Sequence, residues 1–351
     1  MTRKLRAAVI GAGWFAAQNH IPVLAGRPEV VLDGVCRLGA SDLARVKSHF
    51  GFAFASQDPA EVLARDPDIV VVASPHRFHY EHAAAALRAG AHVLCEKPMT
   101  LDPAEAWALV DLARACDRHL LIANSYNYLP QVDALRQRIA GGAIGTLEHA
   151  MCSFVSVTRD VFTGARGLSK WDDTFFRPER STWQDPAAGG GFAYGQLSHS
   201  LALMFFLTGT IPESVGAMTV EQDGVDIADA AMLRLRGGAV ASISGSVAMP
   251  ETGRALMRIF LCGSGGVALA EFDRNIGEIR TNDAPPERLA LGPTDWQVRS
   301  DGPVHALVDL ALGRGTNLSP GDIGARTTAT VAAMLASARA GGAVMPVAGP
   351  E

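Results

Sequence analysis

The fold of this chain is decided by a stretch near its start, Leu5–Ala16, which reads LRAAVIGAGWFA. An apolar run, Leu5–Ile10, leads directly into Gly11, which permits a tight turn, and then Gly13, which lets the backbone approach a ligand closely. Ala16 is small enough for the following helix to pack closely against the strand. A strand, a glycine-rich turn and a helix in this order are typical of a dinucleotide site, where the helix N-terminus faces the pyrophosphate.

The next hundred residues repeat this alternation of apolar runs and helices. The runs are continuously apolar, as expected of parallel strands covered on both faces. We predict strands at Leu5–Ile10, Val30–Cys36, Ile69–Ala73, His92–Cys95 and Leu120–Ala123. Two helices begin in the same way, at Asp58-Pro59-Ala60-Glu61 and Asp102-Pro103-Ala104-Glu105, where Asp can cap, Pro fits the first turn and Glu can return to the cap. Residues 1–125 are therefore predicted to form a doubly wound Rossmann domain.

The pattern changes in residues 126–351, which we assign to a second, C-terminal domain. A helix is expected over Val132–Ala140. Apolar and polar residues then alternate on both sides of Gly237-Gly238, which predicts a hairpin of antiparallel sheet. Late helices are expected at about Val304–Leu312 and Ile323–Ala340, and the long polar stretch Asp160–Gly191 is a candidate functional loop.

Composition excludes several classes of protein. The net charge of −5, with no basic run, argues against a nucleic-acid partner. No apolar run is long enough to span a bilayer and the start lacks a signal-peptide core, so we expect a cytoplasmic protein with no membrane partner. Five scattered cysteines predict neither a disulfide framework nor a zinc knuckle. His76, His79 and His82 recur at every third position, but nothing completes a coordination geometry, so no metal is expected.

The residue after the second strand bears on the choice of cofactor. An acidic residue there would accept the ribose hydroxyls of NAD, whereas this chain has Arg37, which can pair with a 2′-phosphate. The sequence therefore favours NADP, with NAD possible. Trp14 and Phe15 open the helix after the glycines and are expected to contact the cofactor.

Two further segments follow the fourth and fifth predicted strands: Ala73-Ser74-Pro75-His76-Arg77-Phe78-His79 and Gly90-Ala91-His92-Val93-Leu94-Cys95-Glu96-Lys97-Pro98. Together with the glycine turn and later motifs at residues 125–130, 142–145, 189–191 and 199, they resemble the Gfo/Idh/MocA family of glucose–fructose oxidoreductase and inositol dehydrogenase. The resemblance extends over almost the whole chain. It implies a Rossmann domain and, in residues 126–351, a C-terminal α/β domain with a large, mostly antiparallel open sheet. That second domain would bind substrate and form the contacts of a homodimer or homotetramer.

The resemblance also assigns roles in the first domain. The segment under the nicotinamide side of the cofactor corresponds to Ser74, Pro75, His76 and His79. Glu96 and Lys97 match the family's Glu-Lys-Pro motif, in which Lys contacts the nicotinamide ribose and the reacting hydroxyl. The residues agree with this independently. Lys97 follows a parallel strand at the edge where ligands bind, and a buried Lys can titrate low enough to exchange a proton with an alcohol.

In the second domain His199 matches the family's catalytic-helix His, which hydrogen-bonds the substrate hydroxyl and can relay its proton. Four residues earlier the better-studied relatives carry Asp, whereas this chain has Gly195. Tyr194, Gln196 or Asp185 could compensate for that lost carboxylate. Asn127 also stands where many relatives have Arg. Expected substrate contacts are Lys97, Tyr126, Asn127, Trp183 and His199.

Trp171 and Trp183 flank the long polar stretch, and their rings suit the C–H faces of a pyranose or cyclitol. The alternative is that both rings anchor the loop or an oligomer contact.

The activity implied is hydride transfer between nicotinamide and a secondary alcohol or ketone of a sugar, sugar derivative or cyclitol. Lys97 would be the main acid/base and His199 its partner. Two alternatives remain open. One is a non-catalytic regulator that binds cofactor or sugar, and the other is an enzyme that uses tightly bound cofactor in an internal redox cycle.

Overall fold

The computed structural model describes residues 3–164, 167–168, 174–177, 180–289 and 300–350, and it divides into two compact units. The first contains the described residues of 1–125, 169–182 and 300–325, and the second contains those of 126–168, 183–299 and 326–351. The chain therefore returns twice to its first unit. Trp171 lies outside the described residues.

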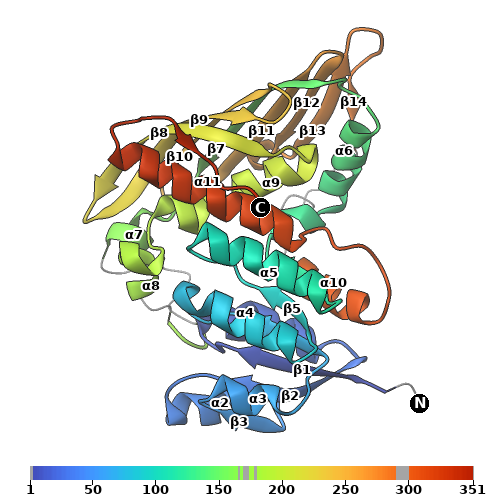
Figure 1. The fold of residues 1–351 in the computed structure, drawn as a ribbon, viewed down its shortest axis with the longest axis vertical. Helices are drawn as coiled ribbons and strands as arrows, with labels where there is room; N and C mark the ends of the chain where they lie inside the picture. Colours follow the sequence, from blue (N-terminus) through green and yellow to red (C-terminus); the bar gives the residue numbers. More distant parts are fainter. Residues whose placement is uncertain (1–2, 165–166, 169–173, 178–179, 290–299, 351) are drawn as a thin grey trace. The chain divides into compact units, whose positions relative to one another are not determined.

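The first unit is built on a six-stranded parallel sheet in the order β3-β2-β1-β4-β5-β6 (Figure 1). The strands are β1 (Leu5–Ile10), β2 (Val30–Cys36), β3 (Phe54–Ser56), β4 (Ile69–Val72), β5 (His92–Cys95) and β6 (Leu120–Ile122). This confirms the doubly wound fold predicted from the sequence. The short strand β3 was not predicted, because three residues carry too little of an apolar pattern to be recognised.

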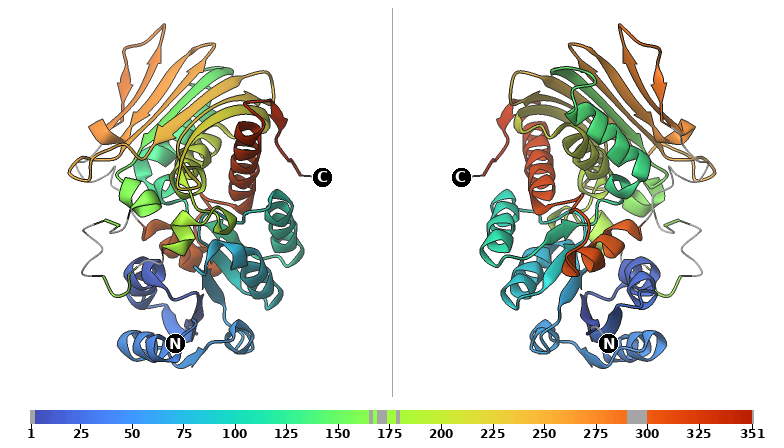
Figure 2. Two further views of the ribbon diagram at one scale, coloured as in Figure 1. Left: turned by 90° about the vertical axis from the view of Figure 1, so that its left-hand side faces the viewer. Right: turned by 90° about the vertical axis from the view of Figure 1, so that its right-hand side faces the viewer.

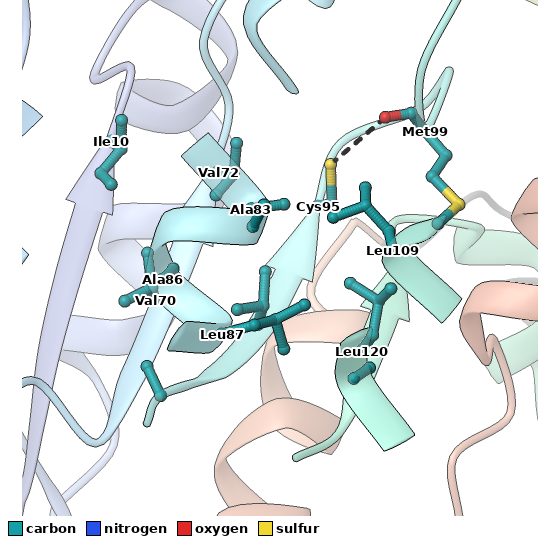
Figure 3. Close-up of a cluster of buried hydrophobic side chains, with 14 of the residues drawn as sticks. Ile10, Val70, Val72, Ala83, Ala86, Leu87, Cys95, Met99, Leu109 and Leu120 are labelled. Carbon is teal, nitrogen blue, oxygen red and sulfur yellow. Dashed lines mark hydrogen bonds between the residues drawn. The ribbon is translucent and has the colours of Figure 1, made fainter. Parts of the chain in front are cut away.

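Helices cover both faces of this sheet and enclose two apolar cores. One face carries α3 (Pro59–Leu63), α4 (His79–Arg88) and α5 (Pro103–Ala115), and the other carries α1 (Ile21–Ala25), α2 (Ala40–Phe50) and α10 (Gly302–Ala311). Figure 3 shows part of the first core, which includes Leu109 beside Cys95; the Cys95 thiol donates to the Met99 carbonyl at 3.8 Å. Burial on both faces explains why these strands are continuously apolar.

Both Asp-Pro helix starts are capped as predicted. Asp58 Oδ1 accepts from the Ala60 N–H at 2.8 Å, and Asp102 Oδ1 accepts from the Ala104 N–H at 2.7 Å. The return bond from Glu61 is not formed, since its carboxylate accepts from the Ser56 hydroxyl at 2.7 Å instead.

The second unit contains a nine-stranded sheet in the order β14-β13-β12-β11-β7-β10-β9-β8-β15. Its strands are β7 (Leu147–Val155), β8 (Pro212–Gln222), β9 (Val225–Leu235), β10 (Val240–Ser246), β11 (Leu256–Gly263), β12 (Gly266–Glu271), β13 (Ile276–Thr281), β14 (Glu287–Arg288) and β15 (Met345–Pro346). All paired neighbours are antiparallel except β7 and β10. The predicted hairpin is confirmed as β9 and β10, with Gly237 and Gly238 at φ +90° and +93°.

Figure 2 shows the longer helices of this unit on one face of the nine-stranded sheet. They are α6 (Pro130–Ala140), α9 (Ser198–Thr208) and the part of α11 (Gly321–Arg339) that belongs to this unit. The shorter helices are α7 (Arg159–Thr163) and α8 (Ser181–Gln184). Within the described chain the opposite face of the sheet carries no helix, as expected of an open sheet.

Candidate active site

The glycine turn after β1 has the geometry of a dinucleotide cradle. Gly11 has φ +89°, and a Cβ atom there would lie 2.2 Å from the backbone N of Ser74, so no larger residue fits. At Gly13 the nearest atom to an added Cβ is 4.0 Å away, which leaves the backbone open to a ligand. Helical turns begin at Trp14 and continue through a π turn, Ala16–His20, into α1. The residues present therefore fit a bound pyrophosphate.

Trp14 and Phe15 lie at the start of this helix and are both partly exposed. Their rings meet edge to face with centroids 5.6 Å apart, and Phe15 meets the His20 ring in the same way at 5.2 Å. The two aromatic residues are thus held beside the glycine turn, where a cofactor contact was expected.

Arg37 follows β2, and its guanidinium already has partners within the chain. It donates to the Ala12 carbonyl at 3.1 Å and to Asp42 Oδ2 at 2.8 Å, and it stacks over the Phe176 ring at 4.0 Å. A 2′-phosphate would meet a guanidinium whose charge Asp42 balances. Asp42 and Phe176 were not identified from the sequence, since neither forms part of a motif.

The segment after β4 lies against the glycine turn. The Ser74 backbone is therefore so close to Gly11 that it leaves no room for a side chain there. Pro75 leads into a 3-10 turn, His76–Phe78, and then into α4. His79 is fully buried, with Nδ1 2.7 Å from the Pro98 carbonyl oxygen and Nε2 2.7 Å from the Ser74 carbonyl oxygen. His76 is also buried, and its ring centroid lies 5.5 Å from that of His79.

Glu96 and Lys97 follow β5 at the same edge of the sheet. Glu96 Oε1 lies 2.7 Å from Nε2 of the buried His20, and Glu96 Oε2 accepts from the Lys97 backbone N–H at 3.1 Å. His20 was missed from the sequence, because nothing in its spacing from the glycine turn shows that the π turn directs it toward β5. The Glu96 carboxylate is therefore fixed from both sides.

The Lys97 amine sits in an environment that favours its neutral form. Burial lowers its pKa to about 8, although the neighbouring Glu96 carboxylate raises it. An amine that titrates close to neutral pH can both accept and return a proton, which is the property expected of a catalytic acid/base.

In the second unit Tyr126, Asn127 and His199 come from two different segments. Tyr126 and Asn127 are buried in the 3-10 turn Ser125–Tyr128, and His199 lies in the first turn of α9. The Tyr126 ring meets the His199 ring edge to face at 5.8 Å, and Phe154 does the same at 6.2 Å. Burial raises the pKa of the Tyr126 phenol, so it stays protonated. The structure thus brings Tyr126 and His199 together and fixes the orientation of the imidazole.

The absence of Asp at position 195 has a steric reason. A Cβ atom on Gly195 would lie 2.6 Å from Cζ of Phe162, so the phenyl ring fills the space that an acidic side chain would need. The same ring meets Trp183 edge to face at 6.3 Å. Of the residues considered as replacements, Asp185 is used as a cap, accepting from the Ala187 N–H at 2.9 Å.

The helix of His199 begins at a buried carboxylate that the sequence did not reveal. Asp226 Oδ2 accepts from the Ala193 N–H at 2.6 Å, and a Cβ atom on Gly191 would lie 2.0 Å from Asp226 Oδ1. Gly191 in turn donates to the Trp183 carbonyl at 3.0 Å. The triple-glycine motif therefore lets the chain pass close to a carboxylate and to Trp183.

Asp226 has a second buried carboxyl beside it, that of Asp229. Residues three apart on a strand normally face opposite sides, but the pairing slips here, with Val220 opposite Ala228 and Glu221 opposite Asp226. Ile227 is the extra residue of a β-bulge, which returns both carboxyls to one face. Burial and the Asp226 charge raise the pKa of Asp229 to about 9.

Within the described residues no group of three or more His, Cys, Asp or Glu side chains could hold a metal ion. Of the helices that the structure describes, none combines the length and the apolar character needed to cross a membrane. The site residues divide between the units: the cofactor candidates and Lys97 lie in the first, whereas Tyr126, Asn127, Trp183 and His199 lie in the second.

Comparison with known proteins gives matches to two models of one family. Residues 5–123 match the model described as oxidoreductase family, NAD-binding Rossmann fold, and residues 132–268 match the GFO/IDH/MocA C-terminal domain. A region of 144 residues is 37% identical to D-glucoside 3-dehydrogenase from Escherichia coli strain K12, and it makes up 41% of each chain. The chain thus spans about two fifths of the length of this curated relative.

Solved structures match over nearly the whole chain. GenD2 from gentamicin A biosynthesis, in complex with NAD, is 25% identical with a TM-score of 0.76, covering 99% of this chain and 98% of that one. Levoglucosan dehydrogenase, in complex with NADH, has a TM-score of 0.79 at 20% identity, covering 99% of this chain and 100% of that one. The second likeness concerns the fold alone.

Proposed function

The chain belongs to the Gfo/Idh/MocA family of NAD-binding oxidoreductases, and on that premise we propose that it catalyses hydride transfer at a sugar-like substrate. A hydride would move between C4 of the nicotinamide and the carbon of a secondary alcohol or ketone in a sugar, sugar derivative or cyclitol. The observation that carries the proposal is Lys97, a lysine at the carboxyl edge of a Rossmann sheet with a pKa lowered to about 8. The relation to D-glucoside 3-dehydrogenase supports a glucoside as the first substrate to try.

Gly11, Gly13 and Ser74 would hold the dinucleotide, since the Ser74 backbone excludes a side chain at Gly11 and the space at Gly13 is open to a ligand. When bound, the nicotinamide supplies the hydride acceptor for an alcohol and the hydride donor for a ketone. A side chain of the protein must accept or donate the proton of the substrate hydroxyl. The neutral Lys97 amine would take this proton as an alcohol is oxidised, and the Lys97 ammonium would return it in the reverse direction.

His199 would hydrogen-bond the same hydroxyl and keep its oxygen oriented toward the amine. Its ring is held edge-on by Tyr126 and Phe154, so it can present one nitrogen in a fixed direction. Asn127 and Trp183 remain proposed substrate contacts. Because Gly195 brings no carboxylate, the proton would depend on Lys97 with His199 as its partner.

Arg37 is the residue on which the choice of cofactor turns. A 2′-phosphate could pair with its guanidinium, so we retain NADP as the preferred cofactor with NAD as the alternative. Asp42 opposes this preference, because it already accepts a hydrogen bond from the same guanidinium.

The open face of the nine-stranded sheet supports a homodimer or homotetramer. Met218, Val220 and Met232 point to this face and are 71%, 57% and 56% exposed. Exposed apolar side chains gathered on one face are typical of a surface that another subunit covers.

The proposal is tested by incubating the protein with NAD or NADP and a panel of glucosides, aldoses, uronates and cyclitols, while reduced-nicotinamide absorbance is followed. A signal with one substrate class that is lost in Lys97→Met supports the dehydrogenase. No signal across the panel, despite cofactor binding, would favour the non-catalytic regulator. Cofactor that survives desalting, and that shows no net redox change while a sugar is consumed, would favour the internal redox cycle.

A further inference from the structure

The environment of His79 imposes a specific protonation state. The ring is fully buried, and each of its two nitrogens lies 2.7 Å from a main-chain carbonyl oxygen, that of Pro98 for Nδ1 and that of Ser74 for Nε2. Carbonyl oxygens only accept hydrogen bonds, whereas a neutral imidazole has one N–H and one bare nitrogen. A neutral ring would therefore leave a nitrogen lone pair facing an oxygen lone pair at hydrogen-bonding distance.

We propose that His79 is held as an imidazolium that donates to both carbonyls, clamps the Ser74 segment to the Lys97-Pro98 segment, and shares the negative charge of Glu96 with Lys97. His79 is thus a positioning residue, since its ring is enclosed and both nitrogens are used by the backbone. It joins the chain after β4 to the chain after β5. These are the two segments expected to lie along the nicotinamide side of the cofactor.

Burial and hydrogen bonding act on this ring in opposite directions. Burial is the largest influence and lowers the pKa of His79 below its ordinary value, whereas the Pro98 and Ser74 carbonyls and the Glu96 carboxylate raise it. His76 and His82 are the other titratable groups beside the ring. The imidazolium therefore depends on the two carbonyl contacts at 2.7 Å, which a neutral ring cannot both satisfy. Glu96 also raises the pKa of Lys97, so an imidazolium would share this counter-charge and leave the protonated Lys97 amine less stabilised.

His82 provides a matched comparison within the same helix. Its Nδ1 lies 2.9 Å from the Ser74 hydroxyl, so it contacts the same residue as His79 does. A hydroxyl can donate or accept, however, so His82 satisfies this contact as a neutral ring. We therefore expect a charged ring at His79, which contacts the Ser74 carbonyl, and a neutral ring at His82, which contacts the Ser74 hydroxyl.

The decisive measurement is the proton count on each ring, taken without substrate or cofactor. Full-length protein labelled with ¹⁵N-histidine would be examined by NMR in water between pH 6.5 and 9. One ring is expected to show two bound protons and ¹⁵N shifts that do not move over this range, and His79→Gln removes that signal. Should this variant fail to fold, single Gln variants of the other nine histidines assign the wild-type ring by elimination. A His79 ring with a single protonated nitrogen would overturn the proposal.

A second readout tests the link to Lys97 and rests on the proposed function. In the pH profile of alcohol oxidation, loss of a neighbouring like charge in His79→Gln should move the limb due to Lys97 upward by about one pH unit. His82→Gln should leave that limb in place. A lower rate with an unmoved limb would reduce His79 to a structural role. A doubly protonated ring in a protein without turnover would support the imidazolium and count against the dehydrogenase.

Discussion

The pH dependence of the reaction follows from the environment of Lys97. Its pKa lies at about 8 instead of the ordinary 10.5. At pH 7 about 9% of an amine with the lower pKa is neutral, compared with about 0.03% of an ordinary lysine, a gain of about 300-fold in the active base. For alcohol oxidation kcat/KM should therefore rise about tenfold per pH unit below pH 8 and level off above about pH 9.

The assay is the initial rate of cofactor reduction between pH 6 and 10 at constant ionic strength, with ketone reduction as the reverse measurement. Reduction should fall over the same interval in which oxidation rises, because it needs the ammonium form. Lys97→Arg keeps the positive charge but cannot release the proton, so we expect a loss of about 10² to 10⁴ in kcat, with cofactor binding retained. A limb near pH 10.5, or the same limb in Lys97→Met, would refute the assignment of this proton to Lys97.

Four other variants test the geometry of the two units. Gly11→Ala places a methyl group against the Ser74 backbone, so calorimetry should show lost cofactor binding, with stability lower by about 3 kcal/mol. Asp229→Asn removes a carboxyl whose pKa is raised in the folded state to about 9. The protonated Asp229 carboxyl contributes fully to the free energy of unfolding below pH 4, and this contribution is lost as pH rises through 9. Free energies of unfolding measured by denaturant titration at pH 6 and pH 9 should therefore differ less in the variant than in wild type. Gly195→Asp should cost about 1 to 3 kcal/mol through contact with Phe162, and a double-mutant cycle with Phe162→Ala should recover part of this loss; strict additivity would contradict the contact. Asp42→Asn should strengthen NADP binding relative to NAD by about fivefold, the scale of one exposed ion pair, and an unchanged ratio of dissociation constants would remove Arg37 from cofactor choice.

Much of the fold could be predicted because it depends on local patterns. The strands of the first unit are buried on both faces, so each is a continuous apolar run, and the Asp-Pro pairs mark helix starts chemically. The packing of α10 could not be predicted in this way. Its apolar face is evident in Val304, Leu307 and Val308, but periodicity does not show that these residues join the core of the first unit.

The site residues divide along the same line. Gly11 belongs to a motif whose spacing and context predict a dinucleotide site, whereas Glu96 and Lys97 were proposed as site residues because they match a motif of the family that the chain resembles. His20 and Asp226 do not, because each acts through a partner distant in sequence and reaches it through a local irregularity: a π turn in one case and a β-bulge in the other. Such irregularities change which face a side chain occupies without leaving a pattern in composition.

Gly195 departs from the family pattern, and the structure gives a steric explanation for this difference. The sequence reveals only that a carboxylate is missing, which is compatible with lost catalysis or with a replacement elsewhere. The structure adds that Phe162 fills the vacated space and meets Trp183, so an apolar wall stands where an acid would be. In the proposed mechanism the proton exchange would therefore depend on Lys97, because position 195 offers no carboxylate and burial lowers the pKa of the Lys97 amine to about 8.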